Sequence, residues 1–119
     1  MIKHVKGDIF QSDADVILHQ VNCQGALLGI AQLVQADKNT IVVNIFAQKN
    51  FGYDGKCYTD YSALRKGLET VRDNNKEDCI AIPYLMGCHR GGGDWNIVSS
   101  MIEEILSDCD VTLYEYNGG

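Results

Sequence analysis

The sequence predicts a single α/β domain spanning residues 1–119. Apolar runs of strand length recur along the chain, and two intervening segments have the apolar period of an amphipathic helix. A glycine-rich loop connects one of these strands to the second helical segment. Strands that alternate with helices are typical of α/β folds, and 119 residues are enough to bury one modest core.

Six segments have the composition and length of β-strands. They are residues 2–5, 16–21, 30–34, 41–45, 79–82 and 111–116, and the turn residues Ala36–Asn39 between the third and fourth predict a hairpin. The second is a continuous apolar run that ends in the polar Asn22, as expected for a central strand whose carboxyl end faces a ligand. His19 lies inside this run and is expected to be a hydrogen-bonded core histidine rather than a catalyst.

The two helical segments begin at recognisable capping residues. Thr59 or Asp60 can cap the first, whose apolar face comprises Tyr61, Leu64, Leu68 and Val71. The second has an apolar face of Ile97, Val98, Met101, Ile102, Ile105 and Leu106. Residues 48–58 have no clear period and are predicted to form a loop that could cover a ligand.

The glycine-rich loop lies between the strand 79–82 and the second helix, and it contains Gly91, Gly92 and Gly93 in succession. Glycines let backbone N–H groups turn inward, and the following helix N-terminus adds a partial positive charge. Such a loop favours an anion, most often a phosphate. It has neither the lysine of a Walker loop nor the dinucleotide pattern G-x-G-x-x-G. The alternative is a flexible connection that ends in Asp94 as a helix N-cap.

Charge and hydropathy restrict the class of partner. The net charge of −6 argues against nucleic acid, which requires a basic surface. No window approaches the roughly 18 apolar residues that cross a bilayer, and no leader precedes the first strand. We therefore expect a cytoplasmic protein, and we expect it to be a monomer.

The five cysteines form an odd set without C-x-x-C spacing, and we expect all of them to be reduced thiols. Cys79 is expected in the core. Cys88, in the glycine loop, is either a small loop side chain or a nucleophile. The adjacent Cys88 and His89 have poor geometry for one metal, and no second ligand pair is present, so we expect neither a metal nor a cofactor.

Three motifs in this order resemble those of a macro domain, the ADP-ribose-binding module. They are Val5–Ile9, His19–Gly25 and the glycine loop that ends in Gly93-Asp94-Trp95. Within the family, the chain is similar to terminal ADP-ribose protein glycohydrolases and related bacterial and phage proteins, along nearly its whole length. The resemblance implies a three-layer α/β/α sandwich around a mixed sheet, with ADP-ribose or an ADP-ribosylated substrate in a cleft at the strand ends.

The resemblance also implies a set of ligand-binding residues. By motif position, Asp8 would hold the adenine amino group with Ile9 beside it, and Asn22 would reach the distal ribose. Gly25 is a further ligand-binding position. The diphosphate would be wrapped by the loop residues Gly87, Cys88, His89, Arg90, Gly91, Gly92 and Gly93.

The catalytic positions depart from the family pattern. The glycohydrolase branch uses a lysine before the variable loop and an aspartate in the glycine loop, where this chain has Gln48 and Gly91. The remaining catalytic candidates are Lys49, as a Schiff-base amine, and His89 and Asp94, as acid–base groups. Two functions therefore stay open: hydrolysis of an ADP-ribosyl or ADP-ribose phosphate ester bond, and non-catalytic ADP-ribose reading. A nucleic-acid-binding domain is a third, which the charge disfavours.

The segment after Gly25 also departs from the family, in which a second glycine-bearing loop and a long helix follow. Here Gly25 is followed at once by Ala26–Ile30. Because a return to a parallel strand needs a crossover of about a dozen residues or more, we expect a helix-bearing unit of roughly 30 residues to be missing. We expect a chain break between Gly25 and Ala26. The alternative is a genuine deletion, which would remove part of the ligand site.

Overall fold

The computed structural model describes residues 2–22, 29–48, 59–88 and 92–116. In chain order the elements are β1 (Ile2–Lys6), the 3-10 helix η1 (Ile9–Gln11), β2 (Val16–Asn22), β3 (Ala31–Gln35), β4 (Ile41–Gln48), α1 (Tyr61–Asn75), β5 (Cys79–Pro83), α2 (Trp95–Ile105) and β6 (Asp110–Glu115). Each predicted strand and helix coincides with an observed element, although β4 extends further than predicted.

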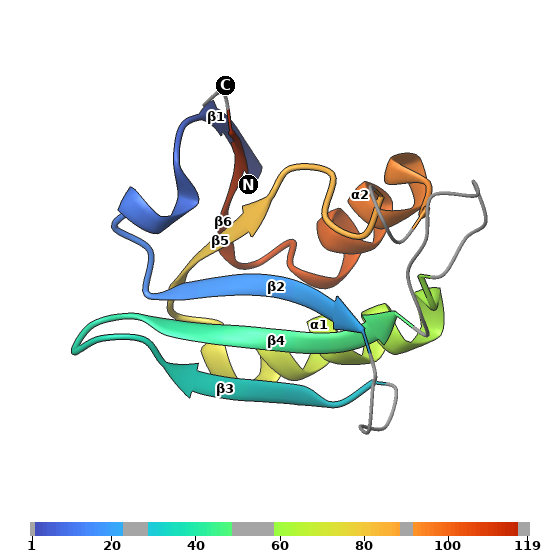
Figure 1. Ribbon diagram of the computed structural model, residues 1–119, viewed down its shortest axis with the longest axis horizontal. Coiled ribbons are helices and arrows are strands. Elements are labelled where there is room, and N and C mark those ends of the chain that lie inside the picture. Colours follow the sequence, from blue (N-terminus) through green and yellow to red (C-terminus); the bar gives the residue numbers. More distant parts are fainter. Residues whose placement is uncertain (1, 23–28, 49–58, 89–91, 117–119) are drawn as a thin grey trace.

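The strands form one mixed sheet in the order β1-β6-β5-β2-β4-β3 (Figure 1). All neighbouring strands are parallel except β3 and β4, which are antiparallel. Asn22 at the end of β2 lies opposite Gln48 at the end of β4, and Ala31 at the start of β3 lies opposite Ile45. β2 therefore ends at the same edge of the sheet at which β3 begins.

The topological reason for expecting a missing crossover helix after β2 does not hold for this strand order. A crossover is needed when the chain has to return before starting a parallel strand, whereas β3 runs back from the edge at which β2 ends. The bond between Gly25 and Ala26 lies outside the described residues.

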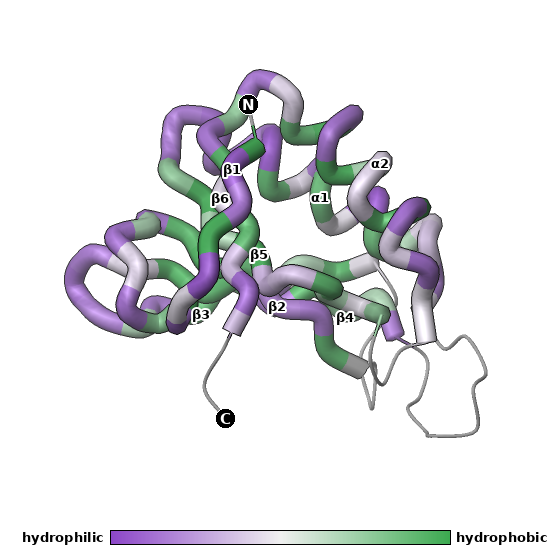
Figure 2. The backbone as a smooth tube through the Cα atoms, turned by 90° about the horizontal axis from the view of Figure 1, so that it is seen from above, coloured by the Kyte–Doolittle hydropathy of each residue, from purple (hydrophilic) through white to green (hydrophobic). Residues whose placement is uncertain are grey.

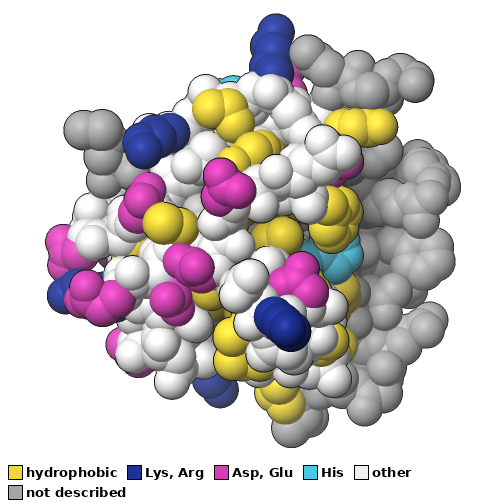
Figure 3. Space-filling model, turned by 90° about the vertical axis from the view of Figure 1, so that its left-hand side faces the viewer, with side chains coloured by type: hydrophobic (Ala, Val, Ile, Leu, Met, Phe, Trp, Pro, Cys, Tyr) yellow, Lys and Arg dark blue, Asp and Glu magenta, His cyan; other side chains and the backbone are white. Residues whose placement is uncertain are grey.

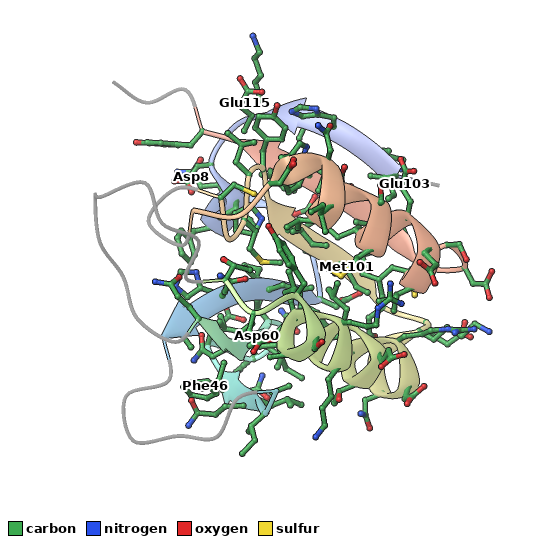
Figure 4. The ribbon with its side chains drawn as sticks, turned by 90° about the vertical axis from the view of Figure 1, so that its right-hand side faces the viewer. Asp8, Phe46, Asp60, Met101, Glu103 and Glu115 are labelled. Carbon is green, nitrogen blue, oxygen red and sulfur yellow. The ribbon has the colours of Figure 1, made fainter. Side chains whose placement is uncertain are left out.

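Both α-helices lie on one face of the sheet, and α1 packs against β4 and α2 (Figures 1 and 2). Figure 4 shows Met101 between α2 and the sheet, with Glu103 pointing away from it. The largest fully buried side chains of this core are Leu18, Ile45, Leu64, Leu68, Ile80, Ile82, Ile102 and Leu106. The α/β class with a mixed sheet is confirmed, and the described residues form two of the three expected layers.

The second face of the sheet carries no α-helix within the described ranges, and this corrects the expectation for His19. Successive side chains of a strand point to opposite faces. Leu18 and Gln20 are buried under the helices, whereas His19 between them is exposed on the second face. His19 is therefore not a core residue.

Cys79 is likewise exposed, so the expectation that it lies in the core is wrong. It is the first residue of β5, and its thiol donates a hydrogen bond to the Asp110 carboxylate at 3.4 Å. This bond, together with the negative charge of Asp110, raises the pKa of the Cys79 thiol. Among the three described cysteines, the buried thiol is that of Cys109, whose pKa is raised by desolvation.

Carboxylate side chains begin both α-helices. Asp60 rather than Thr59 is the N-cap of α1, since its Oδ1 accepts from the Ala63 N–H at 3.0 Å. Asp94 is the N-cap of α2, and its Oδ1 accepts from the Asn96 N–H at 2.9 Å. Neither helix is long and apolar enough to span a membrane, judged over the described residues.

Candidate functional site

The carboxyl ends of the parallel strands carry most of the predicted binding residues. Because β1, β6, β5, β2 and β4 all run in the same direction, their ends bring together segments that are distant in the sequence. Asp8 follows β1, Asn22 ends β2, and the glycine loop follows β5. The side chain of Asn22 is outside what the structure describes.

An aromatic pocket of about 410 Å³ lies at the ends of β1, β5 and β6. It is lined by Gly7, Asp8, Ile9, Phe10, Pro83, Tyr84, Tyr114 and Tyr116. This volume is within the range of small-molecule sites. The structure thus places Asp8 and Ile9, the two residues predicted to bind adenine, in one pocket with four aromatic rings.

Backbone hydrogen bonds between the strand ends hold this aromatic pocket together. The Gly7 N–H donates to the Glu115 carbonyl, and the Tyr84 N–H donates to the Tyr114 carbonyl, both at 2.9 Å. Asp8 Oδ1 accepts from the Phe10 N–H at 2.9 Å, which orients the carboxylate. The walls of the pocket are therefore set mainly by strand register.

The glycine loop begins directly from the aromatic pocket. Pro83 and Tyr84 line the pocket, and the Pro83 carbonyl accepts from the Met86 N–H at 3.0 Å to start the first turn of the loop. Among the described residues of the loop, three have left-handed backbone, with φ of 64° at Leu85, 81° at Gly87 and 65° at Gly92. A leucine in this region is strained, whereas glycine adopts it without cost.

The two ends of the glycine loop meet at the Gly87 carbonyl. It accepts from the Gly93 N–H at 2.9 Å and from the Thr59 hydroxyl at 2.7 Å. A Cβ on Gly93 would lie 2.8 Å from this carbonyl, and a Cβ on Gly87 would lie 2.7 Å from Gln20 Oε1. Both positions therefore need glycine for close approach, and Gly87 needs it for its left-handed conformation as well.

Three buried polar side chains, Gln20, Gln48 and Thr59, lie beneath the loop, exposed by only 8%, 8% and 6%. Gln20 Nε2 donates to Thr59 Oγ1 at 2.9 Å and to Gln48 Oε1 at 3.4 Å. Sequence reasoning missed Gln20 and Thr59 as site residues. The available signal was a polar residue at a helix-facing position of a central strand, where an apolar one is expected.

Of the predicted catalytic residues, the structure describes only Asp94. Its Oδ1 caps α2, and its backbone N–H donates to the Tyr61 hydroxyl at 2.9 Å. The carboxylate is exposed at the end of the glycine loop. Lys49 and His89 lie outside the described residues, as do the predicted ligand-binding residues Gly25, Arg90 and Gly91.

Cys88, the other chemically reactive candidate, is half-buried in the loop. Its thiol donates to the Met86 carbonyl at 3.6 Å, and its backbone N–H donates to the Leu85 carbonyl at 2.9 Å. These contacts suit a loop side chain better than a nucleophile. In the described part of the chain, no group of three His, Cys, Asp or Glu residues could hold a metal.

Acidic side chains gather away from the glycine loop. Figure 3 shows them on the face beside η1 and the β3–β4 hairpin. There Asp13, Asp15 and Asp37 line a separate hollow at the amino ends of β2 and β4.

No family model and no curated protein matches the chain. Solved structures do match it. A protein of unknown function from Bacteroides thetaiotaomicron has a TM-score of 0.80 at 24% identity, over 97% of this chain and 98% of that one. A macrodomain protein from Streptomyces coelicolor has a TM-score of 0.73 at 19% identity, over 100% of both chains. DarTG of Thermosipho africanus, solved in complex with ADP-ribose, has a TM-score of 0.71 at 16% identity, over 96% of this chain and 41% of that one.

Proposed function

Because the chain has the macrodomain fold, we propose that it binds ADP-ribose at the carboxyl ends of its parallel strands. The observation that carries the proposal is the contact between two sites of different chemistry. An aromatic pocket suited to a base and a glycine loop suited to a diphosphate share Pro83 and Tyr84. One of the structures with this fold is a complex with ADP-ribose.

Adenine is assigned to the aromatic pocket. The rings of Tyr84, Tyr114 and Tyr116 offer faces and edges against which a flat base can pack. The hydrogen bond from the Phe10 N–H orients the Asp8 carboxylate, whose second oxygen can accept from the exocyclic amine of adenine. This pairing distinguishes adenine from hypoxanthine, which lacks that donor.

The diphosphate is assigned to the loop Gly87–Gly93. Left-handed glycines at 87 and 92 allow backbone N–H groups to turn toward an anion, and α2 begins directly after the loop. Arg90, His89 and Gly91 belong to this assignment by motif position. Asn22 and Gly25 are assigned to the distal ribose, and Asn22 does end β2 at the same edge of the sheet.

Hydrolysis of an ADP-ribosyl or ADP-ribose phosphate ester bond is the second candidate function. The observation in its favour is the exposed Asp94 carboxylate at the end of the proposed diphosphate loop. Lys49 and His89 complete the proposed catalytic set. The alternative is a non-catalytic reader of ADP-ribose, and the expected setting in either case is a cytoplasmic monomer.

Calorimetry on the full chain tests the binding proposal. ADP-ribose should bind, adenosine should bind more weakly, and the inosine analogue of ADP-ribose should bind more weakly than ADP-ribose itself. Asp13→Ala, in the separate acidic hollow, is the matched control and should bind like the parent protein. If ADP-ribose at millimolar concentration gives no heat of binding, the binding proposal is wrong.

Incubation with ADP-ribosylated protein separates the two remaining functions. If the parent protein releases free ADP-ribose and the Asp94→Asn variant does not, the result supports hydrolysis. Binding without release identifies a reader.

A further inference from the structure

A continuous chain of hydrogen bonds connects the centre of the sheet to the glycine loop. It starts at Gln48 on β4, passes through Gln20 on β2 and the Thr59 hydroxyl, and ends at the Gly87 carbonyl. The two inner bonds, at 2.9 and 2.7 Å, are short and well formed. Residues that are far apart in the sequence thus connect two central strands to one loop carbonyl.

This chain of polar groups is costly to bury. Gln20 lies on the face of β2 that packs under the helices, in line with the apolar Val16 and Leu18. An amide in such a position destabilises the core unless its hydrogen bonds are satisfied, and Gln20 Oε1 has no partner. An apolar side chain would pack here at lower cost, which suggests that the amide serves the loop rather than the core.

The contact between the Thr59 hydroxyl and the Gly87 carbonyl explains the role of the buried polar groups. The Gly87 carbonyl receives the Thr59 hydroxyl and the Gly93 N–H together, so Thr59 braces the point at which the loop closes. Gln20 in turn donates to the hydroxyl oxygen, which leaves the Thr59 proton directed at the carbonyl. The Thr59 hydroxyl therefore supports the carbonyl at which both loop ends meet.

We propose that Thr59, oriented by Gln20, is a positioning residue that holds the glycine loop in the shape that accepts a diphosphate. This inference rests on the proposed function and names the residues that set the affinity of its phosphate subsite. The aromatic pocket does not depend on this contact, because its walls are held by the bonds of Gly7 and Tyr84 to β6. Thr59 therefore affects the binding of the diphosphate and not the binding of the base.

The test is Thr59→Val, which removes the hydroxyl and keeps the shape of the side chain. By calorimetry on the full chain, the Kd for ADP-ribose should rise about tenfold, as expected for the loss of one buried hydrogen bond. The Kd for adenosine should change by less than about twofold. Thr59→Ser should restore most of the affinity. The matched control is Thr112→Val, on β6 and outside both subsites, which should leave both affinities unchanged.

A second measurement needs no ligand. Amide exchange of the Gly93 N–H, followed by NMR, should be several-fold faster in Thr59→Val than in the parent or in Thr112→Val, because the closing bond to Gly87 is weakened. Equal affinities and equal exchange rates in a folded Thr59→Val protein would overturn the proposal. An equal loss of ADP-ribose and adenosine binding would also overturn it, since a general structural defect would then explain the effect. A parent protein that binds no ADP-ribose refutes the proposed function separately, whatever the exchange rates show.

Discussion

The aromatic pocket and the glycine loop are neighbours, yet they are built in different ways. The pocket is formed by strand ends and by four rings, of which Phe10 and Tyr116 are 77% and 70% exposed and Tyr84 and Tyr114 are half-buried. The loop is fixed from beneath by buried amides and a hydroxyl group, and its end glycines have no room for a Cβ. The comparison indicates that the pocket should tolerate substitution, whereas the loop should not. The predictions below test this difference, beginning with the largest expected effect.

Gly87→Ala should have the largest effect. Its backbone is left-handed, and the added Cβ would displace the buried Gln20 amide. We expect the free energy of unfolding to fall by about 2 kcal/mol and ADP-ribose affinity to fall with it. Chemical denaturation measures the first and calorimetry the second. Gly7→Ala in the pocket is the matched control, since a Cβ there meets nothing within 4 Å. Equal stabilities of the two variants would remove the distinction between the regions.

Gly92→Val should separate binding from stability. Gly92 is exposed with φ of 65°, a conformation that a β-branched residue adopts only with strain. We expect ADP-ribose binding to weaken by on the order of 2 kcal/mol, because backbone approach to the diphosphate is blocked. The cost in unfolding free energy should be smaller than that of Gly87→Ala. Unchanged calorimetric affinity in the folded variant would exclude the loop as the diphosphate subsite.

Asp8→Ala should have a moderate effect on affinity, and only through recognition of the base. The loss of one hydrogen bond should reduce ADP-ribose affinity by about 1 kcal/mol. It should also narrow the preference for ADP-ribose over its inosine analogue, because the carboxylate is the proposed acceptor for the adenine amine. The ratio of the two dissociation constants is the measurement. If this ratio is unchanged by the substitution, Asp8 does not recognise the base.

The smallest effect is expected at the pair Arg65–Glu104, which connects α1 to α2 on the surface at 3.2 Å. The hydrogen bond and charge of Arg65 hold the pKa of Glu104 below its ordinary value of 4.5. A carboxylate with a lowered folded-state pKa stabilises the fold above its unfolded pKa, and the contribution disappears as pH falls through the folded value. Glu104→Gln should thus flatten a slight decline in stability below about pH 4.5 and leave ADP-ribose binding unchanged. A changed affinity would connect this surface to the site.

The positions of the helices and strands were predictable from the sequence, because the apolar period of each segment depends only on its own residues. The antiparallel β3–β4 hairpin was predictable as well, from the turn residues 36–39 between its strands. The pairing of β2 with β4 was not predictable, because strand order is a property of the whole sheet, and this pairing removes the need for a crossover directly after β2. His19 and Cys79 were misplaced for a related reason: burial in a strand depends on which face of the sheet is covered.

The placement of the candidate site in the fold was predictable in part. Asp8, Ile9 and the loop glycines belong to recognisable motifs, and the structure places the described ones along one edge of the sheet. The support beneath the loop was not foreseen. Gln20 and Thr59 are 39 positions apart, and their contact exists only after β2 and the start of α1 have come together.

An NMR titration of the full chain with ADP-ribose, and separately with adenosine, tests the central claim most directly. Two regions of different construction should form one ligand site. ADP-ribose should shift the backbone amide signals of Asp8 and Tyr116 in the pocket and those of Gly87, Gly92 and Gly93 in the loop. Adenosine should shift the pocket signals alone. Shifts confined to the acidic hollow, which residues 12–15 and 37–40 line, would contradict the account. Identical shifts with both ligands would also contradict it.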